Sequence, residues 1–148
     1  MLRLPPPIWA MVFLAIAAGV SWALGWPQIP WPQHEAFGIA IFFAGWVLPT
    51  WAFALFRAAG TEIDPVSERN AALVTAGPFR LTRNPMYLGL TFATLGMAIW
   101  IGSWPMLAAP LAVFVIANWG HIPFEEAKMR RQFGAEYDAY ASKVRRWI

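Results

Sequence analysis

The chain has 148 residues, of which 59% are hydrophobic and only 13% are charged. An ordinary soluble domain carries about 25% charged residues, so this composition argues against a water-soluble fold. The absence of cysteine excludes disulfides and thiolate metal sites. His34 and His121, the two histidines, are far apart in sequence, which argues against a His-rich site, and we expect no bound metal.

Four uncharged apolar runs are long enough, or nearly long enough, to cross a membrane as helices. A membrane-spanning helix needs about 20 apolar residues, with a range of about 17–25. Only the turn Gly102-Ser103-Trp104-Pro105 separates the third run from the fourth, so these two helices should form an antiparallel hairpin. The expected helices comprise residues 8–26, 36–56, 85–102 and 104–122.

A four-helix topology places all eleven basic residues on one side of the membrane. They precede the first run, lie between the second and third, or follow the fourth. The positive-inside rule then assigns both termini to the cytoplasmic side of a multi-pass protein, as in a bacterial inner membrane. The start of the chain also resembles a signal peptide, but its apolar stretch is long for one, and we expect an uncleaved helix.

The tail from Glu125 to Ile148 carries apolar and aromatic residues at helical spacing among basic residues. This pattern predicts an amphipathic helix on an anionic membrane surface, interrupted near Gly134, and gives no sign of nucleic-acid binding. The predicted fold class is an all-α integral membrane protein. Four transmembrane helices and a cytoplasmic, interfacial, amphipathic helical tail would form a single domain over residues 1–148, with its oligomeric state left open.

Polar residues gather where the third helix should begin. Asn84 is a typical N-cap and Pro85 suits the first helical position. The unpaired N–H groups of a helix N-terminus favour an anionic ligand, and Arg80 and Arg83 add positive charge beside it. Alternatively, this is a capped helix whose arginines simply satisfy the topology rule. Tyr87 follows within the first turn of the helix.

A second polar cluster ends the fourth helix, where Asn118, His121 and Glu125 are spaced three and four apart and share one helical face. Pro123 is expected to bend the helix there. Glu125 and Glu126 either pair with nearby cations or bind a cationic or hydroxyl-rich ligand. The hairpin would bring both clusters together in a pocket open to cytosol and lipid, which suits a soluble polar cofactor and a membrane-embedded substrate.

Two motifs resemble those of the isoprenylcysteine carboxyl methyltransferase family and the related phospholipid methyltransferases. The first is Gly77-Pro78-Phe79-Arg80 followed by Arg83-Asn84-Pro85-Met86-Tyr87-Leu88-Gly89. The second combines Glu125-Glu126 with Phe133-Gly134, Glu136-Tyr137, Tyr140 and Val144-Arg145-Arg146-Trp147-Ile148. The resemblance covers residues 77–148, about half of the chain, and the first two helices show no diagnostic pattern.

The resemblance implies an enzyme that transfers a methyl group from S-adenosylmethionine to a lipophilic or prenylated acceptor, most like isoprenylcysteine carboxyl O-methylation. Eukaryotic members usually have His where this chain has Asn84, and an amide cannot take up a proton at neutral pH. The implied catalytic residues are Arg80, Arg83, Tyr87, Arg145 and Arg146. The implied cofactor-binding residues are Asn84, Pro85, Met86, Tyr87, Gly89, His121, Glu125, Glu126, Tyr137 and Tyr140.

The methyl acceptor stays open at this stage. A carboxylate needs no base, whereas a lipid amine must first lose a proton, and Tyr87 or a glutamate would be the candidate base. Abundant arginines and the lack of an obvious base favour a carboxylate, while a phospholipid amine and a small lipophilic thiol stay open as acceptors. Two other hypotheses are a nicotinamide-dependent reductase, which would need many more helices, and a small membrane protein without enzymatic activity.

Overall fold

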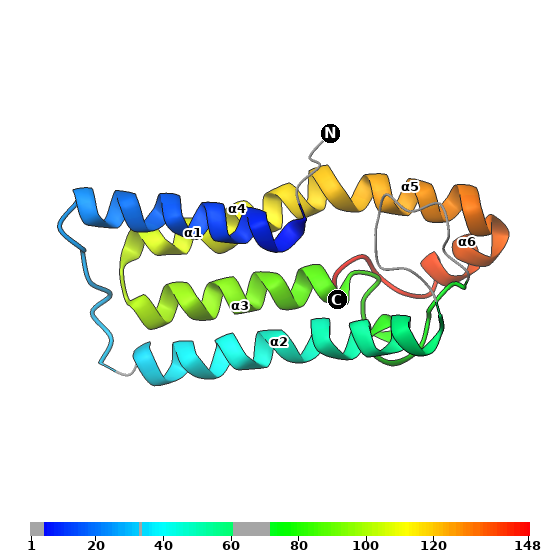
Figure 1. The fold of residues 1–148 in the computed structure, drawn as a ribbon, viewed down its shortest axis with the longest axis horizontal. Helices are drawn as coiled ribbons and strands as arrows, with labels where there is room; N and C mark the ends of the chain where they lie inside the picture. The colour runs from blue at the N-terminus through cyan, green and yellow to red at the C-terminus, as the bar shows by residue number, and fades with distance from the viewer. Residues whose placement is uncertain (1–4, 33, 61–71) are drawn as a thin grey trace.

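The computed structural model of the chain describes residues 5–32, 34–60 and 72–148. Two of the basic residues used for the topology, Arg3 and Arg69, and the loop Thr61–Asn70 therefore lie outside the described residues. The described chain folds into helices (Figure 1). These are α1 (Pro6–Ala23), α2 (His34–Ala58), α3 (Pro85–Ile101), α4 (Ala108–Ile116), α5 (Ile122–Phe133) and α6 (Ala135–Ala141), with 3-10 turns at Gly77–Arg80 and Trp104–Leu107 and a π-turn at Ala117–His121.

The predicted all-α membrane architecture is confirmed. Three helical stretches, Pro6–Ala23, His34–Ala58 and Trp104–Phe133, are long and apolar enough to span a membrane, and α3 is a shorter apolar helix of 17 residues. The first three helices begin and end within three residues of the expected limits. Large apolar side chains such as Trp46, Val47 and Trp119 are exposed on the bundle, as expected for a surface that faces lipid.

The fourth helix is longer than predicted. The membrane span was expected to end at Ile122, with a separate helical tail from Glu125, but helical structure is continuous from Trp104 to Phe133. The π-turn immediately before Pro123 offers the physical reason. A proline ring clashes with the carbonyl group four residues earlier and has no N–H to donate to it, and a π-turn opens the backbone at that place.

Glycines set the distance between α2 and α3, which lie side by side in Figure 1. A Cβ atom added to Gly89 would lie 2.5 Å from the carbonyl oxygen of Gly45, and one added to Gly96 would lie 2.7 Å from that of Gly38. Side chains at these positions would force the helices apart. Gly89, Ala93 and Gly96 therefore form a strip of small residues on α3 that contacts α2.

The hairpin between α3 and α4 forms as predicted. Gly102 ends α3 with a left-handed conformation, φ 73°, and a 3-10 turn beginning at Trp104 leads into α4. Ala17 of α1 packs with Ala98 and Met106 in a small apolar core near this turn. The start of α3 is thereby brought beside the π-turn and α5 at the opposite end of the bundle.

The end of the chain departs from the predicted helical tail. Gly134, with φ 51°, interrupts the helix as expected, and α6 follows it. From Ser142 onward the chain is no longer helical. Residues 142–148, here called the C-terminal strap, turn back toward the start of α3 (Figure 1).

Candidate functional site at the polar end of the bundle

A hydrogen bond joins the two predicted polar clusters. The hydroxyl group of Tyr87, in the first turn of α3, donates to Oε1 of Glu125 on α5 at 2.5 Å. The Tyr87 ring also stacks against the imidazole of His121, with ring centroids 5.9 Å apart and planes inclined by 28°. The site therefore contains a carboxylate beside two aromatic rings, an arrangement that attracts cationic groups.

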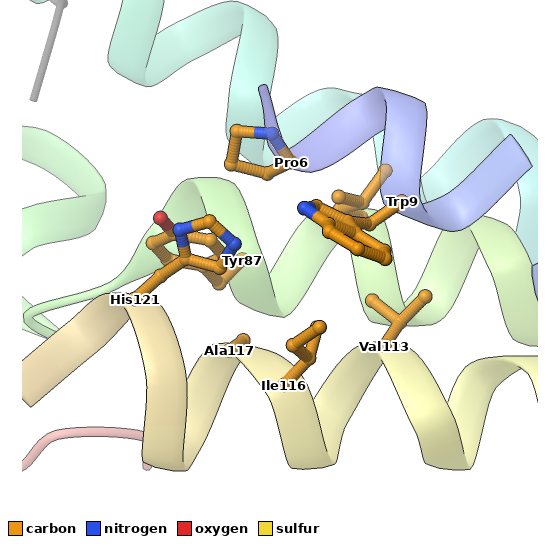
Figure 2. Close-up of a pocket in the computed structure, with 8 residues that line it drawn as sticks. Pro6, Trp9, Tyr87, Val113, Ile116, Ala117 and His121 are labelled. Atoms are coloured by element: carbon orange, nitrogen blue, oxygen red, sulfur yellow. The ribbon is translucent and has the colours of Figure 1, made fainter. Parts of the chain in front are cut away.

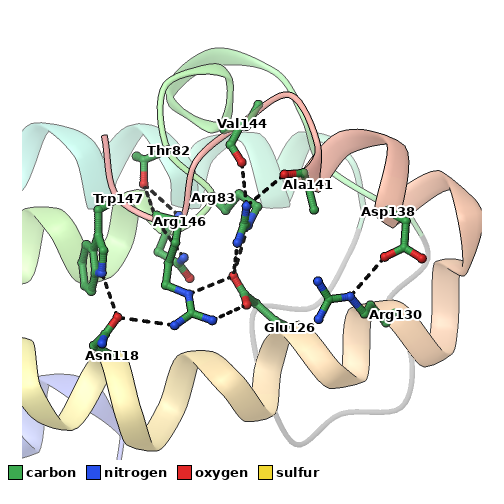
Figure 3. A network of polar contacts seen from close by, with 11 residues as sticks. Thr82, Arg83, Asn118, Glu126, Arg130, Asp138, Ala141, Val144, Arg146 and Trp147 are labelled. Atoms are coloured by element: carbon green, nitrogen blue, oxygen red, sulfur yellow. Dashed lines mark hydrogen bonds and ion pairs between the residues drawn. The ribbon is translucent and has the colours of Figure 1, made fainter.

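Glu126 is buried, with 5% of its surface exposed, and is held by two arginines (Figure 3). Arg83 donates to Oε1 from Nε at 3.1 Å and from Nη2 at 2.7 Å. Arg146 donates to Oε2 from Nη2 at 2.7 Å and to Oε1 from Nε at 3.3 Å. These bonds raise the pKa of the Arg146 guanidinium. Arg83, Glu126 and Arg146, here called the arginine clamp, thus hold together the loop before α3, α5 and the C-terminal strap.

The C-terminal strap is fastened to the loop before α3 by its backbone carbonyl groups. Nη1 of Arg83 donates to the carbonyl oxygen of Val144 at 2.6 Å. Thr82 Oγ1 and Asn84 Nδ2 each donate to that of Arg146 at 2.9 Å. Asn84 occupies the N-cap position as predicted, but its side chain does not cap the helix. The Asn84 side chain instead holds the strap through its hydrogen bond to the carbonyl oxygen of Arg146.

The last anchor of the strap is Trp147. Its indole Nε1 donates to Oδ1 of Asn118 in the π-turn at 2.9 Å, as Figure 3 shows. Its ring lies 4.8 Å from that of Phe114, measured between centroids. Trp147 also packs against the buried cluster that contains Tyr87. The end of the chain therefore forms one wall of the site.

The two predicted tyrosines of the tail lie behind the arginine clamp. Tyr137 is buried and its ring is adjacent to that of Tyr140. Tyr140 donates from its hydroxyl group to the carbonyl oxygen of Phe79 at 2.7 Å. Burial raises the pKa of both phenols, and nearby Glu126 adds to this effect at Tyr137. Both tyrosines therefore stay protonated at neutral pH, and Tyr140 acts as a hydrogen-bond donor.

Several predicted site residues lie away from the clamp. The side chains of Arg80 and Arg145 are exposed. Gly89 faces Gly45 and Pro49 of α2, so its small size serves helix packing. Pro85 is buried at the start of α3, and Met86 beside it is half-buried. The two predicted polar clusters do converge, and Tyr87, His121, Glu125 and the arginine clamp lie where they meet.

A shallow apolar recess lies beside Tyr87 and His121, between the start of α1 and the π-turn (Figure 2). Pro6 and Trp9 of α1 form one wall, and Ala117 belongs to the other. Trp9 was not predicted from the sequence as a site residue. A tryptophan near the end of a membrane helix is typical of an interfacial anchor, and no spacing rule links this position to residues more than one hundred positions later.

Comparison with known proteins relates this arrangement to a family. The chain is 39% identical over 79 residues to a probable protein-S-isoprenylcysteine O-methyltransferase of Oryza sativa, a match covering 49% of this chain and 38% of the relative. It is 29% identical over 110 residues to protein-S-isoprenylcysteine O-methyltransferase A of Arabidopsis thaliana, covering 73% and 55% respectively. Against methanethiol S-methyltransferase 2 of Bradyrhizobium diazoefficiens it is 30% identical over 152 residues, covering 95% and 49%.

The chain thus spans 38% to 55% of the length of these curated relatives. No solved structure matches it with significance. The model of the phospholipid methyltransferase family matches residues 34–136, which include α2, α3, the π-turn and α5. Tyr87, His121, Glu125 and Glu126 all lie within that match. The chain belongs to the phospholipid methyltransferase family.

Proposed function

We propose that this protein is a membrane methyltransferase that uses S-adenosylmethionine and methylates a lipophilic acceptor. The observation that carries the proposal is the Tyr87–Glu125–His121 cluster at one end of an apolar bundle, inside the segment that the family model matches. Its position between the C-terminal strap and an apolar recess suits a reaction between a soluble cofactor and a membrane-dissolved substrate.

The donor set fits the chemistry of this cofactor. S-Adenosylmethionine carries positive charge at its sulfonium and amino groups, and it has ribose hydroxyl groups that donate hydrogen bonds. Glu125 accepts a bond from Tyr87 through Oε1, and its other oxygen would accept from the ribose or amino group. The rings of Tyr87 and His121 would face the cationic part. When bound, the cofactor supplies the reactive methyl group.

The remaining task of the protein is to position the two reactants and to exclude water. An in-line displacement gains mainly from near-attack geometry in a dry site. The clamp of Arg83, Glu126 and Arg146 fixes the strap across the polar end, and Trp147 closes one side. The clamp would act by holding the walls of the cofactor site, while Tyr87 and Glu125 would contact the cofactor.

The orientation in the membrane is part of this proposal. The described basic residues belong to the loop before α3, to α5 or to the strap, apart from Arg57 at the end of α2. All of them lie on the side of the bundle that contains the site. By the positive-inside rule, the site and both termini would face the cytoplasm, where the soluble cofactor is found.

Two acceptor chemistries are suggested by the names of the relatives: an isoprenylcysteine oxygen and the sulfur of methanethiol. Two of the four arginines that favoured a carboxylate acceptor are already paired with a carboxylate of the protein. Arg83 and Arg146 are engaged by Glu126, and Arg80 and Arg145 are exposed. A lipophilic acceptor is common to both chemistries.

The experiment is methyl transfer by the purified full chain in phospholipid nanodiscs. The chain is incubated with S-adenosylmethionine labelled in the methyl group and with a panel of acceptors: farnesylcysteine analogues, octanethiol and phosphatidylethanolamine. Label in an organic-extractable product of any of them supports the proposal. Tyr87→Phe should lower the rate, and Tyr140→Phe, a matched loss of one hydroxyl group outside the cluster, should lower it much less. Label in none of these acceptors contradicts the proposal.

A further inference from the structure

The recess between α1 and the π-turn contains two buried polar atoms without a hydrogen-bond partner, Trp9 Nε1 and His121 Nε2. Within the part of the chain that the structure describes, these are the two buried side-chain polar atoms left in this state. Native proteins keep few such atoms, because each one has lost its water and gained nothing in return. Both occur in one recess, which makes a common ligand the simplest explanation.

The two atoms face a shared, dry space. Figure 2 shows the Trp9 indole nitrogen on the side of its ring toward His121 and Tyr87. The other walls are apolar, with Ala117 and Val113 beneath, and no water molecule fits between them in this conformation. An acceptor would enter by displacing the Trp9 ring or the start of α1, and it would bring the bonding partners that the two nitrogens lack.

Trp9 Nε1 and His121 Nε2 together constrain the chemistry of a ligand that binds in this recess. An indole N–H donates only, and the neutral imidazole offers an acceptor at Nε2 when its proton is on Nδ1. With His121 in this tautomer, a carboxylate would find a single donor, at Trp9, and would be repelled by the lone pair on Nε2. An ammonium group would lose its hydration shell in an apolar recess for a single acceptor. A neutral group with one proton to give and one lone pair to share satisfies both nitrogens.

We propose that this recess is the acceptor subsite of the enzyme and that it binds an alkyl thiol, with His121 as the base and Trp9 as the hydrogen-bond donor to sulfur. This assignment rests on the proposed methyltransferase function and names its substrate class. A thiol is distinguished from an alcohol by acidity. A thiol is several pKa units more acidic than an alcohol and therefore gives up its proton to a histidine base more readily.

The reaction balances without a further reagent. The S–H proton passes to Nε2 of His121, and the thiolate accepts the hydrogen bond of Trp9. The thiolate sulfur then forms a bond to the methyl carbon as the bond from that carbon to the donor sulfonium breaks. The electron pair of the broken bond stays on the donor sulfur, which becomes a neutral thioether. The imidazolium finally releases its proton to water at the polar end of the bundle.

The geometry connects this subsite to the cofactor cluster through Tyr87. The ring of Tyr87 stacks on His121, and its hydroxyl group bonds to Glu125. One residue thus contacts both the proposed base and the proposed cofactor ligand. The opposite wall, Trp9, comes from α1, which lies outside the segment matched by the family model. Acceptor selection would therefore depend on a helix that is not part of the family match.

The test uses the full chain in nanodiscs with two probe thiols. Octanethiol is protonated at neutral pH and needs a base, whereas 4-nitrobenzenethiol is already ionised. His121→Phe retains a ring to stack on Tyr87 and removes Nε2. It should lower octanethiol turnover by about 100-fold or more and lower 4-nitrobenzenethiol turnover by less than about 10-fold. Trp9→Phe should lower the efficiency with both thiols by about 3- to 10-fold.

The controls separate this subsite from the cofactor site. Trp22→Phe, at an exposed position on the same helix, should leave turnover unchanged. Calorimetric titration with S-adenosylhomocysteine should give unaltered affinity for Trp9→Phe. His121→Asn serves as the second variant if His121→Phe does not fold.

Cofactor binding and methylation of farnesylcysteine without any thiol methylation would overturn the acceptor assignment and leave the proposed function standing. Equal losses with both thiols would also overturn the role of His121 as base. No cofactor binding by the folded wild-type chain would overturn both.

Discussion

The Tyr87 hydroxyl group donates to Glu125 Oε1 at 2.5 Å and so joins the first turn of α3 to α5. These two residues are 38 positions apart in sequence, and the tight turn at Gly102 is what brings them together. Because the same tyrosine stacks on His121, the contact fixes three side chains of the candidate site at once.

Replacing Tyr87 by Phe should weaken binding of S-adenosylhomocysteine by about 10-fold. A hydrogen bond to a charged group contributes about 1.5–3 kcal/mol, and the Glu125 carboxylate would lose the bond that orients it. Isothermal calorimetry with the detergent-purified variant measures this change. Tyr140→Phe, which loses a bond to a backbone carbonyl group, is the control and should change the affinity by less than about 3-fold.

Glu126→Gln should both destabilise the protein and weaken cofactor binding by about 10-fold or more. A neutral amide cannot balance two guanidinium groups, and breaking a buried ion pair costs about 3–5 kcal/mol. A thermal unfolding scan and calorimetry measure the two effects. Asp138→Asn removes an exposed ion pair with Arg130 and should cost less than about 1 kcal/mol. Equal effects of the two substitutions would contradict the role of the clamp.

Trp147→Ala should release the C-terminal strap. It removes the hydrogen bond to Asn118 and the ring contact with Phe114, the last two anchors of the chain. Hydrogen exchange followed by mass spectrometry should show faster exchange of the Arg83 amide, which donates to the carbonyl oxygen of Arg145 in the strap. Exchange in the middle of α2 should be unaffected. Unchanged exchange at Arg83 would show that the strap is held without Trp147.

Gly89→Ala should destabilise the bundle by about 1–3 kcal/mol, because the added methyl group would overlap the Gly45 carbonyl group and Pro49 across the α2–α3 interface. Gly19→Ala is the matched control, since a Cβ at that position meets nothing within 4 Å. Thermal unfolding of both variants in the same detergent compares them. A drop in stability of Gly19→Ala as large as that of Gly89→Ala would argue against close helix packing as the cause.

The orientation can be tested with single cysteines, because the chain has none of its own. Gln28 and Lys143 are exposed at opposite ends of the bundle. In intact spheroplasts, a membrane-impermeant maleimide should label Gln28→Cys and should label Lys143→Cys only after the membrane is opened. The reverse pattern would place the site on the outer side of the membrane.

The helices, the hairpin and the meeting of the two polar clusters were predictable from sequence. The length of apolar runs and the position of charges determine the membrane spans. A four-residue turn forces the two helices that it joins to pack side by side. The contact of Tyr87 with Glu125 follows from that hairpin. The break at Gly134 was also predictable, since glycine readily adopts the positive φ found there.

The rest depends on contacts that no local pattern encodes. Asn84 has the features of a helix cap, but its side chain bonds to a carbonyl group 62 residues later. The continuation of the helix through Pro123 depends on a π-turn, which has no reliable sequence signature. The strap and the Trp9 wall likewise arise from long-range packing. The family resemblance implied a catalytic role for Arg146, whereas the structure pairs this residue with Glu126.

The most direct test of the central claim is calorimetric titration of the detergent-purified full chain with S-adenosylhomocysteine, alongside a sample of the Tyr87→Phe variant. We predict saturable binding to the wild-type chain at micromolar affinity and weaker binding to the variant. No binding by a wild-type sample that unfolds cooperatively on heating would contradict the account, because a methyltransferase of this kind must hold its cofactor at the polar end of the bundle.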